Sequence, residues 1–185
     1  MEKRVLVPVA DGIEEMETVT IVDVLRRAGA DVTVASVENL QIAASRGVVL
    51  VADQRIKECV DNEFDLIVLP GGMPGAEHLR DSEPLKRLLL RQAEEKKLYA
   101  AICASPAVVL AYHGLLKSRF STCHPGFTDR MEPDRFRESE VVVDENCITS
   151  RGPGTALAFA LKLVELLYSR EKAEQVAAPM VTRLM

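Results

Sequence analysis

The sequence predicts an α/β fold in which a mostly parallel central sheet lies between layers of helices. Short apolar runs of strand length alternate with longer segments that have helical periodicity. The strand-like runs are apolar at nearly every position, which is typical of parallel strands covered on both faces. Glycine or proline closes several of these segments, as expected at turns.

Turn signals divide the first half of the chain into separate elements. Asp11 and Gly12 close the apolar run KRVLVPVA, and Gly29 ends a segment whose apolar residues recur at helical spacing. A glycine pair follows the run FDLIVLP in the same way. The expected elements are a strand over residues 3–10, a helix over 16–28, a strand over 31–37, an extended or hairpin segment from residue 47, and a strand over 64–70.

The second half of the chain continues this alternation. Leu85, Leu88 and Leu89 lie on one face of a strongly helical segment. No repeat or linker interrupts the chain, so we expect a single domain over residues 1–185. The expected elements are a helix over 83–96, a strand over 98–102, a helix to about residue 112, a loop-rich segment from 114 to about 138, a hairpin of EVVVD and CITS, and helices over 154–167 and 170–178.

The composition is that of an ordinary globular protein. Hydrophobic residues make up 48% and charged residues 28% of the chain, and opposite charges are interspersed. The net charge of −5 argues against a surface built for nucleic acid or an anionic membrane. No apolar run approaches the ~18 residues of a membrane span, and the N-terminus does not read as a signal peptide. We therefore expect a cytoplasmic protein without a membrane partner.

The four cysteines and three histidines are scattered along the chain. No CxxC pair occurs, and the spacings match no zinc-binding pattern, so the sequence predicts no metal site. In a reducing compartment the four thiols are expected to stay free.

Three segments of interest directly follow predicted strands. They are the segment 11–17, the glycine turn 71–75 and Cys103. In a parallel sheet the reactive crevice lies beyond the carboxyl ends of the strands. We therefore expect the three segments to meet at one edge of the sheet.

Cys103 stands where the strand LYAAI turns into a helix that begins near Ser105 and Pro106. In a nucleophile elbow, a turn of this kind lifts a side chain to the open end of the sheet. The start of the helix favours negative charge, so we expect it to lower the pKa of the thiol and to offer N–H groups to an oxyanion. The alternative is a buried structural cysteine.

Three glutamates, Glu14, Glu15 and Glu17, follow the first strand. Carboxylates complement the positive end of a helix, which explains one or two of them. Glu17 lies among apolar positions and is expected to point inward, where burial raises its pKa. There it could donate a hydrogen bond to a thiolate or act as a general acid–base.

The remaining candidate residues each have an ordinary explanation as well. The glycines of LPGGMPG can direct N–H groups toward a bound oxygen, or form a plain strand–helix turn. His124 could form a Cys–His pair, although a lone loop histidine is more often a surface residue. Cys123 is either a second reactive thiol or a buried one. Arg151 could bind an anion, but a structural ion pair is the preferred interpretation.

Taken in order, several stretches resemble the ThiJ/PfpI superfamily, in the branch of the Parkinson disease protein seven (DJ-one) and YajL. The stretches are GIEEMETVTIVDVLRRAGADVTVAS, SRGVVLVAD, FDLIVLPGGMPGA, AAICASPA, CHPGF and ITSRGPGTALAFAL. Each is weak alone, but their combination and order are specific. The resemblance covers nearly the whole chain. It implies a flavodoxin-like three-layer sandwich and a homodimer, which we expect to form through the first helix and neighbouring strands.

The resemblance also implies roles for single residues. Ser105 departs from the family pattern, because its hydroxyl replaces a smaller group and could alter the pKa of the thiol. The implied roles are Cys103 as the reactive cysteine, Glu17 as its acid, His124 as a nearby histidine, and the amides of Gly72 and Ala104 as the oxyanion hole.

Two functions of different classes follow from this site. The first is a cofactor-free glyoxalase that converts methylglyoxal or glyoxal to a hydroxy acid, or a deglycase acting on glycated proteins or nucleotides through the same first adduct. The second is a redox-sensing chaperone whose Cys103 is oxidised to the sulfinate. A cysteine peptidase is a weaker third hypothesis, because the compact chain shows no obvious extended substrate cleft.

Overall fold

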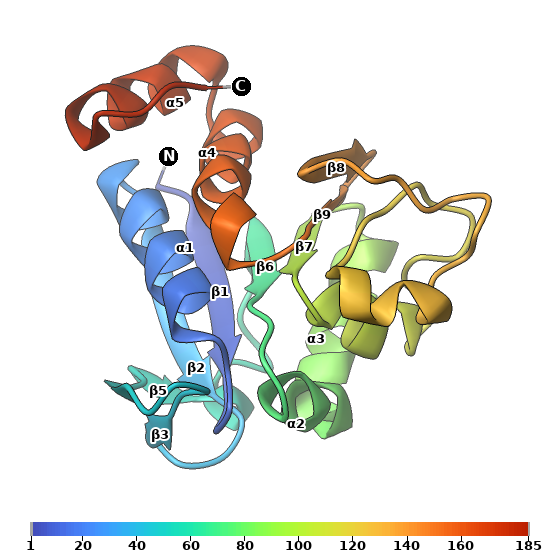
Figure 1. Cartoon of the computed structure of the whole chain (residues 1–185). Coiled ribbons are helices and arrows are strands. Elements are labelled where there is room, and N and C mark those ends of the chain that lie inside the picture. The colour runs from blue at the N-terminus through green and yellow to red at the C-terminus, as the bar shows by residue number, and fades with distance from the viewer. Residues whose placement is uncertain (1, 185) are drawn as a thin grey trace.

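The computed structural model describes residues 2–184, in which a seven-stranded sheet lies between two layers of helices (Figure 1). The strand order is β5-β2-β1-β6-β7-β9-β8. Neighbouring strands are parallel except for the antiparallel pair β8 and β9. The predicted α/β fold with a mostly parallel central sheet is confirmed.

The elements have the following bounds. The main sheet contains β1 (Arg4–Val9), β2 (Asp31–Ser36), β5 (Gln54–Arg55), β6 (Leu66–Leu69), β7 (Leu98–Ile102), β8 (Val141–Asp144) and β9 (Cys147–Ser150), and a separate hairpin contains β3 (Gln41–Ala43) and β4 (Val49–Val51). The helices are α1 (Glu15–Arg27), α2 (Gly75–Asp81), α3 (Glu83–Glu94), α4 (Ala156–Leu167) and α5 (Arg170–Ala177). Short helical turns are η1 (Ile56–Glu58), η2 (Pro106–Ala111), η3 (Pro125–Arg130), η4 (Pro153–Thr155) and η5 (Ala178–Met180).

The three central strands, β1, β6 and β7, are apolar because both of their faces are covered. Their side chains are buried at almost every position. Helices α1 and α4 pack together on one face of the sheet, and α2, α3 and η2 lie on the other (Figure 1). Burial on both faces explains why these runs lack the polar–apolar alternation of a half-exposed strand.

Three short elements, α2, β3 and β5, were not predicted. Helix α2 follows the turn GGMPG directly, and its Ala76 and Leu79 are buried. The segment from Gly47 does form a hairpin, but its first strand, β3, and the edge strand β5 were not predicted. Each of these strands has only two or three residues, so it is stabilised by pairing with a distant segment rather than by its own pattern.

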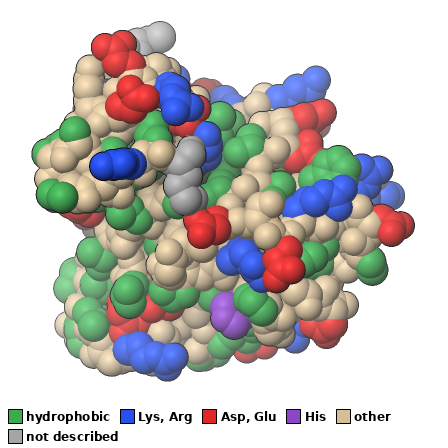
Figure 2. Space-filling view, turned by 45° about the horizontal axis from the view of Figure 1, so that its top comes forward, with side chains coloured by type: hydrophobic (Ala, Val, Ile, Leu, Met, Phe, Trp, Pro, Cys, Tyr) green, Lys and Arg blue, Asp and Glu red, His purple; other side chains and the backbone are tan. Residues whose placement is uncertain are grey.

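Acidic and basic side chains are interspersed over the face of the molecule in Figure 2, as the sequence predicted. Within residues 2–184, no helix combines the length and the apolar character needed to cross a bilayer. Over the same residues, no three side chains of His, Cys, Asp or Glu are grouped so that they could hold a metal ion.

Candidate active site

The three segments singled out from the sequence meet at one edge of the sheet. Strands β1, β6 and β7 are neighbours, so the segments that follow their carboxyl ends lie side by side. The N–H of Glu14 donates to the carbonyl oxygen of Gly71 over 2.9 Å. A side chain at Gly71 would place its Cβ only 2.5 Å from the Cβ of Cys103, so glycine is required for this close approach.

Cys103 occupies a strained turn at the end of β7. Its φ of 65° lies in the left-handed region, which residues other than glycine rarely adopt. Its N–H donates to the carbonyl of Ser150 over 3.1 Å, and the buried Ser105 hydroxyl donates to the carbonyl of Pro70. Strain of this kind is typical of functional sites. Because the Ser105 hydroxyl is engaged at the end of β6, it fixes the turn instead of acting on the thiol.

Glu17 points inward beneath the thiol, as the sequence predicted. Its side chain is fully buried, and Cys103 is 9% exposed. One carboxylate oxygen of Glu17 accepts the N–H of Gly71 over 2.7 Å. The other carboxylate oxygen, Oε1, has no hydrogen-bond partner within residues 2–184. The carboxyl group lies close enough to the Cys103 thiol for each group to change the pKa of the other. The loop after β6 therefore holds one oxygen of the carboxyl group, and the other oxygen is not engaged.

Burial raises the pKa of Glu17 to about 7. The hydrogen bond from Gly71 and the neighbouring Cys103 side chain act in the opposite direction, and the charge of Glu14 adds a further increase. A carboxyl group with a pKa near neutrality can both accept and donate a proton under ordinary conditions. This confirms the inward position and the raised pKa that we expected for Glu17.

The expected low pKa of Cys103 is wrong for the resting site. Burial, together with the charge of the neighbouring Glu17 carboxylate, raises the pKa of its thiol to about 12. The N–H groups of Gly72 and Ala104 lower it, but they do not outweigh the first two causes. At neutral pH the resting pair therefore consists of a thiol beside a carboxyl group that is partly ionised. A base must remove the thiol proton during attack, and Glu17 is the adjacent base.

His124 lies beside the cysteine turn. Its backbone N–H donates to the carbonyl of Cys103 over 2.8 Å, which joins the loop-rich region to the end of β7. Its Nδ1 accepts the N–H of Gly126 over 3.1 Å, so the proton of the neutral ring lies on Nε2. His124 is exposed and lines the same pocket as Cys103.

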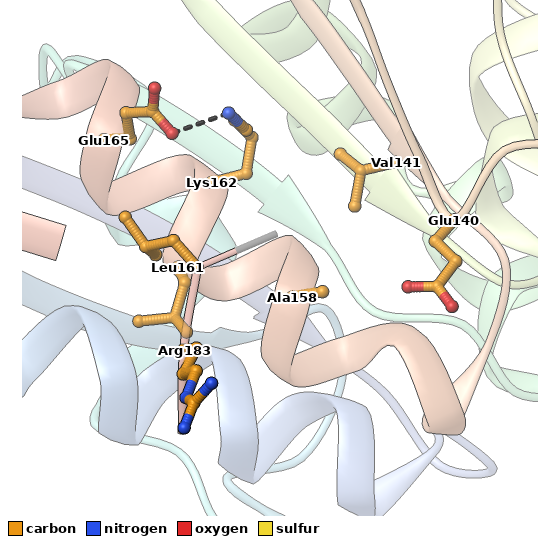
Figure 3. A pocket seen from close by; sticks show the side chains of 8 residues that line it. Glu140, Val141, Ala158, Leu161, Lys162, Glu165 and Arg183 are labelled. Atoms are coloured by element: carbon orange, nitrogen blue, oxygen red, sulfur yellow. Dashed lines mark hydrogen bonds and ion pairs between the residues drawn. The ribbon is translucent and has the colours of Figure 1, made fainter. Parts of the chain in front are cut away.

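Cys103 opens into a pocket of about 490 Å³. A second pocket of about 320 Å³ lies between β8, α4 and the C-terminal segment (Figure 3), and none of the predicted site residues lines it. Its Lys162 is paired with Glu165 over 2.6 Å. The first pocket is lined by Cys103, Gly72, Ala104, His124, Glu14 and Arg46, among others.

Arg46 was missed by sequence reasoning. It lies in the turn of the β3–β4 hairpin, and its N–H donates to a carboxylate oxygen of Glu15 over 2.8 Å. The Ser45 hydroxyl donates to the other oxygen of Glu15 over 2.9 Å. Glu15 therefore holds this turn in addition to lying at the start of α1. The turn SRG between two apolar segments was the available signal, but its distance from Cys103 in the sequence concealed the link.

The other cysteines and Arg151 have structural surroundings. Cys59, Cys123 and Cys147 are buried, and no disulfide is formed within the described residues. Arg151 forms an ion pair with Glu138 over 3.3 Å, which confirms the preferred interpretation.

Known proteins are similar to this chain in sequence and in fold. Residues 3–166 match the DJ-1/PfpI family. Protein DJ-1 homolog B of Arabidopsis thaliana is 53% identical over 175 residues, which cover 94% of this chain and 40% of that protein. The glutathione-independent glyoxalase DJR-1.2 of Caenorhabditis elegans is 37% identical over 95% of this chain and 94% of that protein. Oxidized DJ-1 of Toxoplasma gondii superposes with a TM-score of 0.96 at 48% identity, over 97% of this chain and 98% of that chain.

The lengths of these relatives differ. The chain spans less than half of two Arabidopsis relatives, namely 40% and 44% of their lengths.

Proposed function

The chain belongs to the DJ-1/PfpI family, as its motifs predicted, and we propose that it is a cysteine-dependent, glutathione-independent glyoxalase that converts methylglyoxal to lactate. The carrying observation is the buried pair of Cys103 and Glu17, which faces the N–H groups of Gly72 and Ala104 at the base of a pocket. The name of the Caenorhabditis relative supports this activity.

The first step is attack of the Cys103 sulfur on the aldehyde carbon of methylglyoxal. A carbon–sulfur bond forms, the thiol proton passes to Glu17, and the carbonyl oxygen becomes negatively charged. The N–H groups of Gly72 and Ala104, which lie beside the Cys103 sulfur, would stabilise this oxygen. Because the resting thiol is protonated, proton transfer to Glu17 accompanies the formation of the bond.

The second step moves a proton between the two substrate carbons. Glu17 first passes the thiol proton to the charged oxygen, which gives a hemithioacetal and restores the carboxylate. It then moves the proton of the carbon bound to sulfur to the neighbouring carbonyl oxygen, which gives an enediol, and finally moves the hydroxyl proton of the first carbon to the second carbon. The first carbon is thereby oxidised to a thioester and the second is reduced to an alcohol. Water then breaks the carbon–sulfur bond, lactate leaves and the thiol is restored, so no cofactor is needed. His124 assists by positioning this water.

The same adduct allows a deglycase reaction on glycated proteins or nucleotides, because the sulfur attacks the same carbonyl-derived carbon. We also propose that the protein acts in a reducing compartment such as the cytoplasm, where its four buried cysteines stay free. Defence against reactive carbonyl compounds fits both proposals.

The test is product analysis with purified protein and methylglyoxal. Lactate should accumulate to many molecules per chain, and Cys103→Ser should form none above the uncatalysed rate. Cys147→Ser is the matched control, because Cys147 is buried outside the pocket. Absence of lactate with the unchanged protein would refute the glyoxalase.

The alternative is a redox-sensing chaperone. The Toxoplasma relative has been solved in an oxidized form, and in this chain the Glu17 carboxyl group is a neighbour of Cys103 that would hydrogen-bond a sulfinate. This function predicts one oxidation event per chain and no multiple turnover. Mass spectrometry of Cys103 during the same incubation separates the two functions.

We further propose a homodimer formed through α1 and the β3–β4 hairpin. Val19 is 51% exposed and Val51 is 70% exposed, and both line a groove between the two elements. Apolar surface of this kind is commonly buried between subunits. We expect Val51→Glu to convert the dimer to a monomer in light scattering, whereas a monomer in the unchanged protein would contradict the proposal.

A further inference from the structure

We propose that Arg46 makes the pocket selective for 2-oxoaldehydes that carry a carboxylate, with Arg46 binding that carboxylate. This inference rests on the proposed glyoxalase and names the class of substrate that the pocket favours. Methylglyoxal has no charged group, so it would not use this arginine.

Hydrogen bonds at the hairpin turn fix the position of the Arg46 backbone. The Ser45 hydroxyl and the Arg46 N–H both donate to the carboxylate of Glu15, at 2.9 and 2.8 Å. The N–H of Ser45 also donates to the carbonyl of Ile13 over 2.7 Å. These bonds attach the hairpin turn to the segment that follows β1. The backbone of Arg46 is therefore held at the rim of the pocket that contains Cys103.

The guanidinium of Arg46 forms no ion pair with a carboxylate among residues 2–184, which sets it apart from Lys162 of the second pocket. In that pocket, shown in Figure 3, the charge of Lys162 is neutralised by Glu165 over 2.6 Å. The Glu15 carboxylate instead contacts the backbone N–H of Arg46. A planar guanidinium without a partner is suited to a bidentate contact with a ligand carboxylate.

The other charges of the pocket are already engaged. A carboxylate oxygen of Glu14 accepts the N–H of Glu17 over 2.6 Å, so Glu14 is attached to the start of α1. Glu17 lies behind the thiol, where it is fully buried. Glu14 disfavours an anion near its own carboxylate, so the substrate carboxylate is expected at the guanidinium of Arg46.

The size of the pocket supports a substrate larger than methylglyoxal. Its volume of about 490 Å³ lies within the range of pockets that hold ligands much larger than a three-carbon compound. A suitable probe is 4,5-dioxopentanoate, which is methylglyoxal extended by a CH2–COO− group. Its aldehyde carbon would bond to the Cys103 sulfur. The same internal proton transfer and hydrolysis would give 2-hydroxypentanedioate, with one carbon oxidised, the next reduced and one water consumed.

The test compares 4,5-dioxopentanoate with its neutral methyl ester. For the unchanged protein we expect a lower KM for the acid. Arg46→Ala should raise the KM for the acid by about 10–100-fold, the scale of a lost charge-assisted contact, and leave kcat nearly unchanged. The values for the ester and methylglyoxal should stay within about twofold. Arg46→Lys should restore part of the loss for the acid. Arg87→Ala, an exposed arginine on α3, is the matched control.

Equal losses for acid and ester in Arg46→Ala would overturn the inference, as would a preference of the unchanged protein for the ester. Binding is measured separately by protection of Cys103 from iodoacetamide with 4-oxopentanoate, which has the carboxylate but no aldehyde. Protection that disappears in Arg46→Ala, without turnover of any 2-oxoaldehyde, would refute the glyoxalase and retain the anion site. Absence of both protection and acid preference would refute the anion site alone.

Discussion

Two buried cysteines lie near opposite ends of strand β7, and their surroundings differ. Cys103 follows the carboxyl end, and Cys147 of β9 pairs with Tyr99 near the amino end. Burial raises the pKa of both thiols to about 12. Tyr99, whose own pKa is raised well above its ordinary value by burial, cannot take a proton from Cys147 at neutral pH. Glu17 can take one from Cys103, so the neighbouring base, rather than the resting pKa of the thiol, distinguishes a nucleophile from a structural cysteine.

Replacing Glu17 should leave Cys103, like Cys147, without a neighbouring base. We expect Glu17→Gln to lower lactate formation by about 10²–10⁴-fold, the usual contribution of positioned proton transfer. The amide can still accept the Gly71 N–H, so the fold should persist. Steady-state lactate formation is the measurement, with the exposed Glu83 of α3 changed to Gln as the control. Activity near that of the unchanged protein would remove Glu17 from the mechanism.

Alkylation rates should also distinguish Cys103 from Cys147. Thiolate is the reactive form, so the rate of Cys103 alkylation by iodoacetamide should rise about tenfold per pH unit from about pH 8 to 10 without a plateau. Glu17→Gln should alkylate faster at about pH 8, because the carboxylate charge that raises the Cys103 pKa is gone. Cys147, which is 1% exposed, should react only on unfolding. Peptide mass spectrometry follows both sites, and a plateau below about pH 8.5, the value of a free thiol, would contradict the raised pKa.

The free energy of unfolding should depend on whether Glu17 is ionised. Its folded pKa, about 7, lies above the ordinary value of 4.5, so the folded protein binds this proton more tightly than the unfolded chain does. The free energy of unfolding should therefore fall as pH rises from 4.5 to 7 and level off above that range. Glu17→Gln lacks this loss and should gain about 3 kcal/mol relative to the unchanged protein between about pH 4.5 and 8.

Urea unfolding at about pH 4.5 and about pH 8 measures that gain. The Glu83→Gln control should show no comparable change between the two pH values, because Glu83 is exposed. An equal difference between Glu17→Gln and the unchanged protein at both pH values would show that Glu17 does not titrate as its burial implies.

The sequence was sufficient to predict those parts of the site that directly follow a recognisable strand. Cys103 directly follows an apolar strand, and parallel strands bring their carboxyl ends together, so its meeting with the loops before Glu17 and around Gly72 was predictable. Helix α2 was not, because the turn residues GGMPG dominate the local signal. The position of Arg46 depends on hydrogen bonds to Glu15 across 31 residues. The pKa of Cys103 depends on burial by three loops and on the Glu17 charge, neither of which the helix start reveals.

The β3–β4 hairpin forms a sheet of its own, apart from the seven strands that carry Cys103. The turns that bring Cys103 and Gly72 to the pocket follow central strands, whose backbone amides should exchange with solvent most slowly. Ser45 and Arg46 of the pocket belong instead to the hairpin, which hydrogen bonds to Ile13 and Glu15 attach to the segment after β1. Mutations in the hairpin can accordingly change which molecules enter while the nucleophile keeps its geometry. This division would let related proteins diverge in substrate preference while retaining one chemistry.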